Sequence, residues 1–269
     1  MADIRSKISE IYSLEQLAAG RSSVHGVHPF AKLAGTVVFL LCVISFDRFA
    51  FGRLVPYIFY PVILMSLAEI PYWMILKRTL VALPFCLFAG LSNLLLDRAA
   101  LYHIGTLAIS GGFLSFATIL FRTLLCVSAV LILVAVTPFS ELTAQLRRLH
   151  IPGLFIMLFE MTYRYIGVLL EETASMYTAY RLRSTTARGL EMRHMGSFVG
   201  QLLLRSFDRA ERIYNAMKCR GYALRSTPPQ HRALAKADFV YLFCTCALPL
   251  LFRLVNVPAL FSAWLGGLL

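Results

Sequence analysis

Two short segments of this chain carry an arginine in the same setting, which makes them the first candidates for a binding function. Both read Tyr-x-Ala-x-basic-x-Arg-small, from Tyr177 to Ser184 and again from Tyr214 to Gly221. A guanidinium stays ionised and presents a planar fork of donors, so two copies could hold two equivalent carboxylates or carbonyls on a partner. The alternative is that Arg183 and Arg220 are ordinary basic helix ends, with Gly221 as a C-terminal cap. The residues alone leave both interpretations open.

The repeat extends beyond the arginines. Ala179 and Ala216 occupy matched positions, 37 residues apart in the sequence like the two tyrosines. An acidic residue, Glu171 or Asp208, stands six positions before each tyrosine. We expect these two carboxylates to steady neighbouring Arg or Lys side chains. The segment 187–189 also reads Ala-Arg-Gly but lacks the preceding Tyr and Ala, so we do not count it as a third copy.

The first motif is expected to end a long amphipathic helix that begins near Ile151. Residues 151–170 are apolar enough to be taken for a membrane span, but Glu160 and Arg164 lie four apart on one face and would be costly in lipid. A helix lying against the membrane and running on to Arg183 explains the pattern better. Its apolar positions step by three and four: Phe159, Tyr163, Ile166, Leu170, Thr173, Tyr177 and Tyr180.

A second amphipathic helix is expected from about Glu191 to Arg220. Gly196 and Gly200 within it form a pair of small residues that could let another helix come close. A short polar helix over 140–150 should precede the first amphipathic helix, and a turn over 184–189 should separate the two. The stripe of the second helix again has the helical period: Met195, Val199, Leu202, Ser206, Ala210, Ile213 and Met217.

The rest of the chain has the composition of an integral membrane protein. It is 58% hydrophobic with a mean hydropathy of +0.70 over 269 residues. We expect an all-α membrane protein: a bundle of about five to six transmembrane helices plus a cytoplasmic or interfacial domain of crossed amphipathic helices. The apolar runs are 29–46, 54–70, 79–96 and 104–136, the last divided near Gly111-Gly112 and Arg122.

These runs predict four parts of the chain. Residues 1–28 form an N-terminal cytoplasmic arm, and residues 29–136 hold transmembrane helices 1–4. Residues 137–236 form the domain of the two amphipathic helices. Residues 237–269 form one or more C-terminal transmembrane segments, interrupted by Pro249, Arg253 and Pro258.

The positive charge is concentrated where the two arginine motifs lie. The formal net charge is +12, and residues 138–236 hold 15 of the 26 Lys and Arg against 7 of the 14 Asp and Glu. Basic residues gathered between membrane spans mark the cytoplasmic face. No basic groove interleaved with aromatic residues is present, so the sequence favours a membrane surface and a protein partner and excludes nucleic acid.

Signatures of catalysis and of metal binding are missing from the sequence. There is no Walker A loop, no nucleophile elbow, no His-Glu-x-x-His and no Cys-x-x-Cys. His25 and His28 lack a third ligand and read as loop histidines, and His150 with Glu141 is too little for a lipid-modifying enzyme. Lys32 is expected to snorkel to the interface. Within the apolar runs the ionisable residues stand singly, so no proton or ion relay is expected: Lys32, Glu69, Arg122 and Arg253.

The paired motifs resemble the twin Ala-x-x-x-Arg-Gly signatures of the T components of energy-coupling-factor (ECF) transporters, which are ATP-driven importers. The nearest match is the cobalt-type (CbiQ) branch, which shares Arg-Ala-Glu-Arg-x-Tyr-x-Ala-Met-x-x-Arg-Gly-Tyr, here Arg209 to Tyr222. The first copy departs from the family in having Ser184 where Gly is frequent. The resemblance covers about 29–222 and is strongest from Ile151 onward.

The resemblance implies a non-catalytic energy-coupling subunit in a cell's inner or cytoplasmic membrane, without cofactor or metal of its own. Its partners would be two ABC ATPase subunits, a membrane S subunit that captures the substrate, and in cobalt systems a small accessory membrane protein. Arg183 and Arg220 would dock the ATPases, with Ala179 and Ala216 kept small to seat the helices in a groove. Cobalt is the implied substrate; nickel or a vitamin is the alternative, and a stand-alone metal channel or carrier is a further rival that would need ligand-bearing spans.

Overall fold

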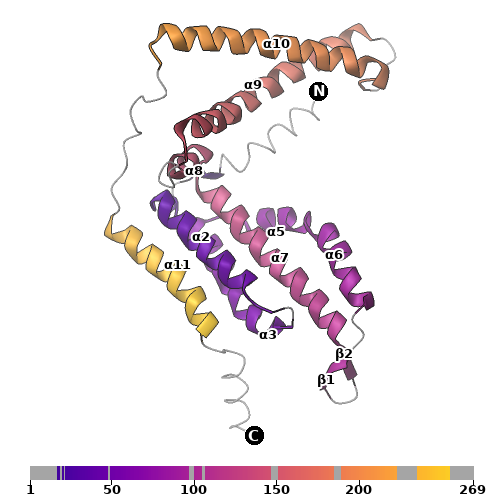
Figure 1. Cartoon of the computed structure of the whole chain (residues 1–269), viewed down its shortest axis with the longest axis vertical. Coiled ribbons are helices and arrows are strands. Elements are labelled where there is room, and N and C mark those ends of the chain that lie inside the picture. Colours follow the sequence, from indigo (N-terminus) through magenta and orange to yellow (C-terminus); the bar gives the residue numbers. More distant parts are fainter. Residues whose placement is uncertain are drawn as a thin grey trace. The chain divides into compact units, whose positions relative to one another are not determined.

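The computed structural model describes residues 17–18, 20, 22–47, 49–96, 100–104, 107–146, 151–184, 189–222 and 235–254 (Figure 1). These residues form helices and one short β-hairpin, which confirms the predicted helical membrane class. Four helices are long and apolar enough to cross a membrane, and the shorter helix α2 is also apolar. The number of crossings stays a prediction. The four are Phe51–Ala68, Gly111–Val136, Gly153–Arg183 and Lys236–Leu254.

The chain divides into two compact units, with one division inside helix α8 (Phe139–Leu146) between Leu142 and Thr143. One unit holds the helices before that point together with α11 (Lys236–Leu254). The other holds α9 (Gly153–Arg183) and α10 (Met192–Cys219). We refer to them as the bundle unit and the two-helix unit. The expected domain boundaries at 137 and 236 stay a prediction.

The first apolar run of the bundle unit forms α2 (Pro29–Ile44), close to the predicted bounds. Proline at its first position needs no hydrogen-bond partner there, and His28 caps the helix by accepting the Phe30 N–H at its Nδ1, 3.1 Å away. His25 is also engaged, with Ser22 Oγ 2.6 Å from its Nδ1 and the Leu17 carbonyl 2.9 Å from its Nε2. Both histidines therefore serve local structure at the start of α2.

The second and third apolar runs are more broken than their hydropathy suggests. The second forms α3 (Phe51–Leu54), a 3₁₀ turn η1 (Val55–Ile58) and α4 (Phe59–Ala68). Glu69, with φ of 56°, ends α4 in the left-handed region, and Pro71 starts α5 (Tyr72–Leu80). The third run is divided at 81–82 and continues as α6 (Leu83–Leu96).

The fourth run differs from expectation in two ways. An antiparallel hairpin stands at its start, with β1 (Ala100–Ile104) mostly before the run and β2 (Leu107–Ser110) within it, a feature that hydropathy does not signal. Helix α7 (Gly111–Val136) begins at Gly111, as predicted, but continues unbroken through Arg122. The prediction that Arg122 divides the run was wrong, because its guanidinium donates to the carbonyl oxygens of Phe46 and Asp47 beside the helix.

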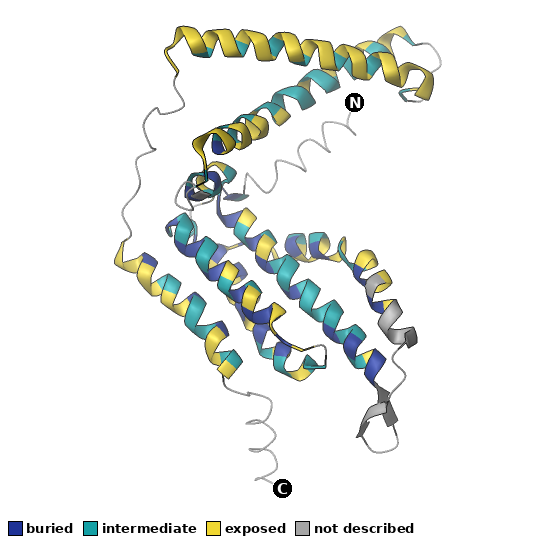
Figure 2. Ribbon diagram, in the orientation of Figure 1, coloured by how far each residue is buried: buried dark blue, intermediate teal, exposed yellow. Residues whose placement is uncertain are grey.

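Helix α7 is the centre of the bundle unit and packs against α2, α3, α4, α5 and α6, while α11 packs on α2 (Figure 1). Buried residues follow the inner faces of these helices (Figure 2). Phe39 stacks on Tyr60 at 4.0 Å between ring centroids. Gly35 permits the close approach of α11, since a Cβ at that position would lie 2.5 Å from Thr245 Oγ1.

Two buried charged residues tie the start of α2 to α7 and α11. Lys32 is 2% exposed, and its Nζ donates to the carbonyls of His25 at 3.0 Å and Val136 at 3.2 Å. Asp238 is also 2% exposed and accepts the backbone N–H groups of His28 and Ala235, both at 2.8 Å. The prediction that Lys32 snorkels to the interface was therefore wrong, because backbone carbonyls satisfy its ammonium group inside the protein.

Candidate functional site on helices α9 and α10

Helix α9 carries the first arginine motif on one continuous helix, as predicted. It begins after Pro152 and runs without interruption from Gly153 to Arg183. Ile156 is its one buried residue in this structure, and Phe159 and Ile166 of the predicted stripe are about half exposed, at 53% and 46%. The helix therefore offers apolar side chains that its own unit does not cover.

The first motif lies at the C-terminus of α9. Arg183 is the last helical residue and is exposed, as is Ala179 one turn earlier. Ser184 caps the helix in an extended conformation, with φ of −92° and ψ of 122°, and its N–H donates to the Tyr180 carbonyl at 3.0 Å. A residue with a Cβ adopts the left-handed conformation only at a cost, so Ser184 leaves the helix directly.

The second motif ends α10 with a different geometry. Gly221 has a φ of 66°. The Tyr222 N–H donates to the Met217 carbonyl, and the Gly221 N–H donates to the Lys218 carbonyl, both at 3.0 Å. This is the glycine cap that the sequence suggested. Arg220 occupies the C-cap and is exposed, and Ala216 is exposed beside it. The cap and an exposed arginine coexist at this end.

The two helices run antiparallel, and a carboxylate joins them. Glu172 pairs with Arg205 Nη1 at 2.5 Å and with Arg209 Nη2 at 3.1 Å. Nearer the end of α9, the rings of Tyr180 and His194 lie 5.8 Å apart. Because α9 ends beside the start of α10, the two motifs lie at opposite ends of the pair, and the 28 residues of α10 span about 42 Å at 1.5 Å per residue.

The ion-pairing carboxylate is not one of those named from the sequence. Glu171 and Asp208 are exposed and make no ion pair with other described residues. Glu172 and Arg209, which meet, are 37 residues apart and so occupy matched positions of the repeat. Opposite charges at matched positions of a repeat are a signal that could have pointed to this contact.

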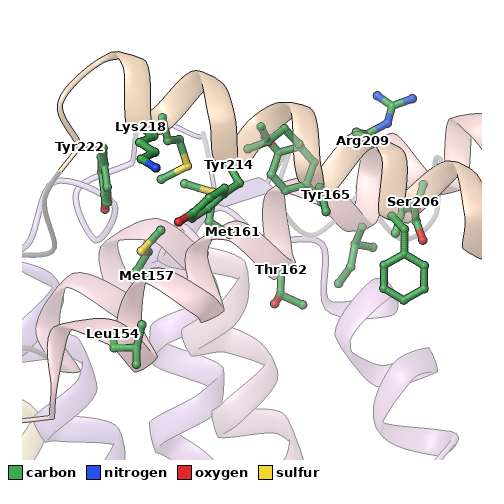
Figure 3. A pocket seen from close by; sticks show the side chains of 16 residues that line it. Leu154, Met157, Met161, Thr162, Tyr165, Ser206, Arg209, Tyr214, Lys218 and Tyr222 are labelled. Atoms are coloured by element: carbon green, nitrogen blue, oxygen red, sulfur yellow. The ribbon is translucent and has the colours of Figure 1, made fainter.

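A groove of about 790 Å³ opens between the first half of α9 and the second half of α10 (Figure 3). Its walls are mainly apolar and include Tyr214 of the second motif, whereas Tyr177 of the first motif does not line it. The lining residues are Leu154, Met157, Met161, Thr162, Tyr165, Ile166, Leu169, Ser206, Phe207, Arg209, Ala210, Ile213, Tyr214, Met217, Lys218 and Tyr222.

A second, more polar hollow of about 560 Å³ lies where α9 ends and α10 begins. It brings together three residues singled out in the first motif: Ala179, Arg183 and Ser184. Arg205 and His194 contribute from α10. The equivalent residues of the second motif, Ala216, Arg220 and Gly221, line neither hollow, so the two motif ends present different surroundings.

Both motif arginines are available for a partner. In the described part of the chain, the ion pairs of the two-helix unit involve Glu172 and Glu191, and neither Arg183 nor Arg220 takes part. The described residues also hold no cluster of three or more His, Cys, Asp or Glu that could bind a metal. The arrangement can therefore bind acidic or carbonyl groups at two separated points.

Fold and site together define a multi-pass helical membrane protein with a pair of long, largely exposed helices, each of which ends at an exposed arginine. The chain belongs to the CbiQ family of cobalt transport proteins, because the sequence profile of that family matches residues 20–230. This confirms the family suggested by the paired motifs.

Individual relatives cover shorter stretches. The cobalt transport protein CbiQ of Rhodobacter capsulatus is 35% identical over 91 residues, 34% of this chain and 37% of the relative. The nickel permease LarQ of Lactiplantibacillus plantarum is 34% identical over 86 residues, 32% of each chain. An uncharacterized protein of Methanocaldococcus jannaschii is 27% identical over 172 residues, 60% of this chain and 58% of the relative. The chain thus matches from about a third to under two thirds of the length of these relatives.

Proposed function

We propose that this chain is the T subunit of an ECF-type importer, which passes the motion of ATPase subunits to a substrate-binding membrane subunit. The observation that carries the proposal is the pair of exposed arginines, Arg183 and Arg220, at opposite ends of the antiparallel α9 and α10. Each can form a charge-assisted contact with one ATPase subunit. The chain itself takes no part in chemistry and holds no cofactor.

The proposed partners follow from the two kinds of surface on the two-helix unit. The cationic ends suit acidic or carbonyl groups on two ABC ATPases. The apolar groove lined by Met157, Ile166 and Met217 suits the membrane S subunit. Removing such a surface from water lowers the free energy of the complex and so favours binding. A small accessory membrane protein is a further proposed partner.

The proposed mechanism is a change in the position of the two helix ends. ATP binding closes the ATPase pair, and each ATPase subunit then moves the arginine that it holds, Arg183 or Arg220, along with the helix that carries it. Because Glu172 links α9 to α10, a displacement of either helix alters the groove between them. The altered groove moves the S subunit, which carries the metal ion across.

Location and substrate belong to the same proposal. The excess of basic residues over 138–236 favours a cytoplasmic two-helix unit and N-terminus in the inner or cytoplasmic membrane. We propose that α9, although long and apolar enough to span, lies along the membrane so that Arg183 reaches the ATPases. Cobalt is the proposed substrate from the family, and nickel is the second candidate because one relative is a nickel permease.

Co-purification tests the docking role. Arg183→Ala or Arg220→Ala should weaken ATPase binding by about 2 to 5 kcal/mol each if the contact becomes buried, and the double variant should co-purify with little ATPase. Arg193→Ala is the matched control, because Arg193 is also exposed on α10 but lies outside both repeats and outside residues 209–222. The tagged full-length chain would be purified from its native membrane and the bound ATPase quantified.

Undiminished ATPase with the double variant would contradict the proposal. Equal loss with Arg193→Ala would also contradict it, because general positive charge would then account for binding. Uptake of radiolabelled cobalt and nickel by the reconstituted complex would separate the two substrates.

A further inference from the structure

Three arginines converge on the connection between α2 and α3 in the bundle unit. We define the arginine cluster as Arg53 of α3, Arg122 of α7 and Arg253 of α11. Arg122 donates to the carbonyls of Phe46 and Asp47, and Arg253 donates to the carbonyl and hydroxyl oxygens of Ser45 at 3.2 and 3.1 Å. Arg53 donates to the Arg253 carbonyl at 3.2 Å.

Two of the three positive charges share the Phe46 ring, and the third, that of Arg122, lies at the carbonyl of the same residue. The guanidinium carbons of Arg253 and Arg53 lie 4.4 and 5.2 Å from the centroid of Phe46. A ring and a few carbonyls offer only partial negative charge, so they leave the net charge of the cluster in place.

None of the three arginines forms an ion pair in the part of the chain that the structure describes. The ion pairs found there lie in the two-helix unit and involve Glu172 and Glu191, so none reaches the arginine cluster. In addition, the Nε atoms of Arg53 and Arg122 are buried without a protein acceptor. Like charges at the edge of an apolar bundle are costly unless an anion accompanies them.

The surroundings of the cluster indicate what kind of anion this is. The cluster lies at the C-terminal end of α2, whose 16 residues cover about 24 Å from Pro29, a large part of the roughly 30 Å hydrocarbon thickness of a bilayer. Large apolar side chains flank it on both neighbouring helices. They are Leu41 and Ile44 of α2, exposed by 63% and 58%, and Leu251 and Leu254 of α11, exposed by 54% and 84%.

We propose that the arginine cluster binds the phosphodiester of an anionic phospholipid, with the acyl chains lying along the apolar faces of α2 and α11. Guanidinium groups bind phosphate oxygens in pairs of hydrogen bonds. Arg122 and Arg253 each donate to protein oxygens through Nη2, and the other N–H groups of each guanidinium are left as donors for the lipid. A free phosphate ion would use the cationic groups alone, whereas a lipid uses them and the exposed leucines together. This proposal does not depend on the ECF assignment.

Native mass spectrometry of the full-length chain in neutral detergent tests the site. The probes are phosphatidylglycerol and phosphatidylcholine with identical acyl chains, and inorganic phosphate in a separate arm. Three cations near a membrane surface should favour the anionic lipid by about a hundredfold, at roughly fivefold for each cation. Equal retention of the two lipids by the unaltered chain would overturn the proposal, and so would displacement of phosphatidylglycerol by an equal concentration of inorganic phosphate.

Substitutions test whether the preference for phosphatidylglycerol depends on the arginine cluster. Arg253→Gln should reduce the preference for phosphatidylglycerol about fivefold, whereas Lys77→Gln, which removes an exposed charge from α5 in the same unit, should leave it unchanged. If Arg253→Gln does not fold, Arg253→Lys keeps the charge but loses the planar fork, and a severalfold reduction is still expected. An unchanged preference in the folded Arg253 variant, or an equal loss in Lys77→Gln, would assign the lipid to another place and overturn the proposal.

Discussion

Gly221 shows at the scale of one residue how backbone geometry positions a candidate binding group. Its φ of 66° ends α10 directly after Arg220 and leaves that side chain at the exposed tip. Ser184, at the matched position of the first motif, is extended and makes no such turn. The two motifs are therefore similar in sequence, but the backbone leaves their helices in different conformations.

Replacing Gly221 with alanine should destabilise the protein by about 1 kcal/mol, because a Cβ is disfavoured at positive φ even where space is open. The matched control is Gly196→Ala inside α10, where no heavy atom lies within 4 Å of the added Cβ, and this change should stabilise by roughly 0.5 to 1 kcal/mol. Unfolding in mixed micelles, followed by far-UV circular dichroism, measures both. Effects of the same sign would count against a backbone explanation.

At the scale of the helix pair, one carboxylate connects α9 to α10. Glu172 is 22% exposed and reaches two arginines four residues apart on α10. It stands between the apolar groove, which Arg209 helps to line, and the polar hollow, which Arg205 helps to line. The ion pairs of Glu172 therefore hold the two helices together at a point between the two motifs. The first motif lies toward the end of α9 and the second toward the end of α10.

A double-mutant cycle should reveal this connection. Glu172→Gln and Arg209→Gln should show a coupling of about 0.5 to 1 kcal/mol in the free energy of unfolding, a modest value because both groups are partly exposed and screened. The coupling should fall as salt is raised. Glu171→Gln is the control and should change stability by less than about 0.5 kcal/mol. Additive effects of the two substitutions would show that the pair contributes nothing to holding the helices.

At the scale of the whole molecule, the proposed function depends on the side of the membrane that the two-helix unit faces. Cys219 provides a natural probe, because its thiol is free and exposed at the end of α10 beside Arg220. Cys42 and Cys86 are buried, whereas Cys244 of α11 is also exposed and has to be replaced by serine in the chain that is labelled. Chemical labelling of Cys219 can therefore report both the orientation and the occupancy of the second motif.

A membrane-impermeant maleimide should label Cys219 in inverted vesicles and leave it unmodified in intact cells. Bound ATPase subunits should slow the labelling, because they would cover the adjacent arginine. Cys219→Ser is the control for reaction at the other thiols. Labelling of Cys219 from outside intact cells would place the motif on the wrong side for an ATPase and exclude the proposed role.

The sequence by itself determined the two long helices α9 and α10 and several helix ends. The continuous α9, the start of α7 at Gly111 and the cap at Gly221 were all predictable, because helical period and capping depend on residues within about five positions of one another. The paired motifs likewise identified the family before any three-dimensional information was used.

The tertiary structure alone decided where the charged side chains of the apolar runs find their partners. Lys32 bonds to a carbonyl 104 residues away, and Arg253 bonds to Ser45 across 208 residues. Hydropathy treats each of these residues as an isolated cost, whereas folding brings backbone carbonyls to them from distant segments. Glu172 and Arg209 meet for the same reason: the antiparallel course of α9 and α10, which no local pattern encodes, brings these two residues together although it places the two motif arginines at opposite ends.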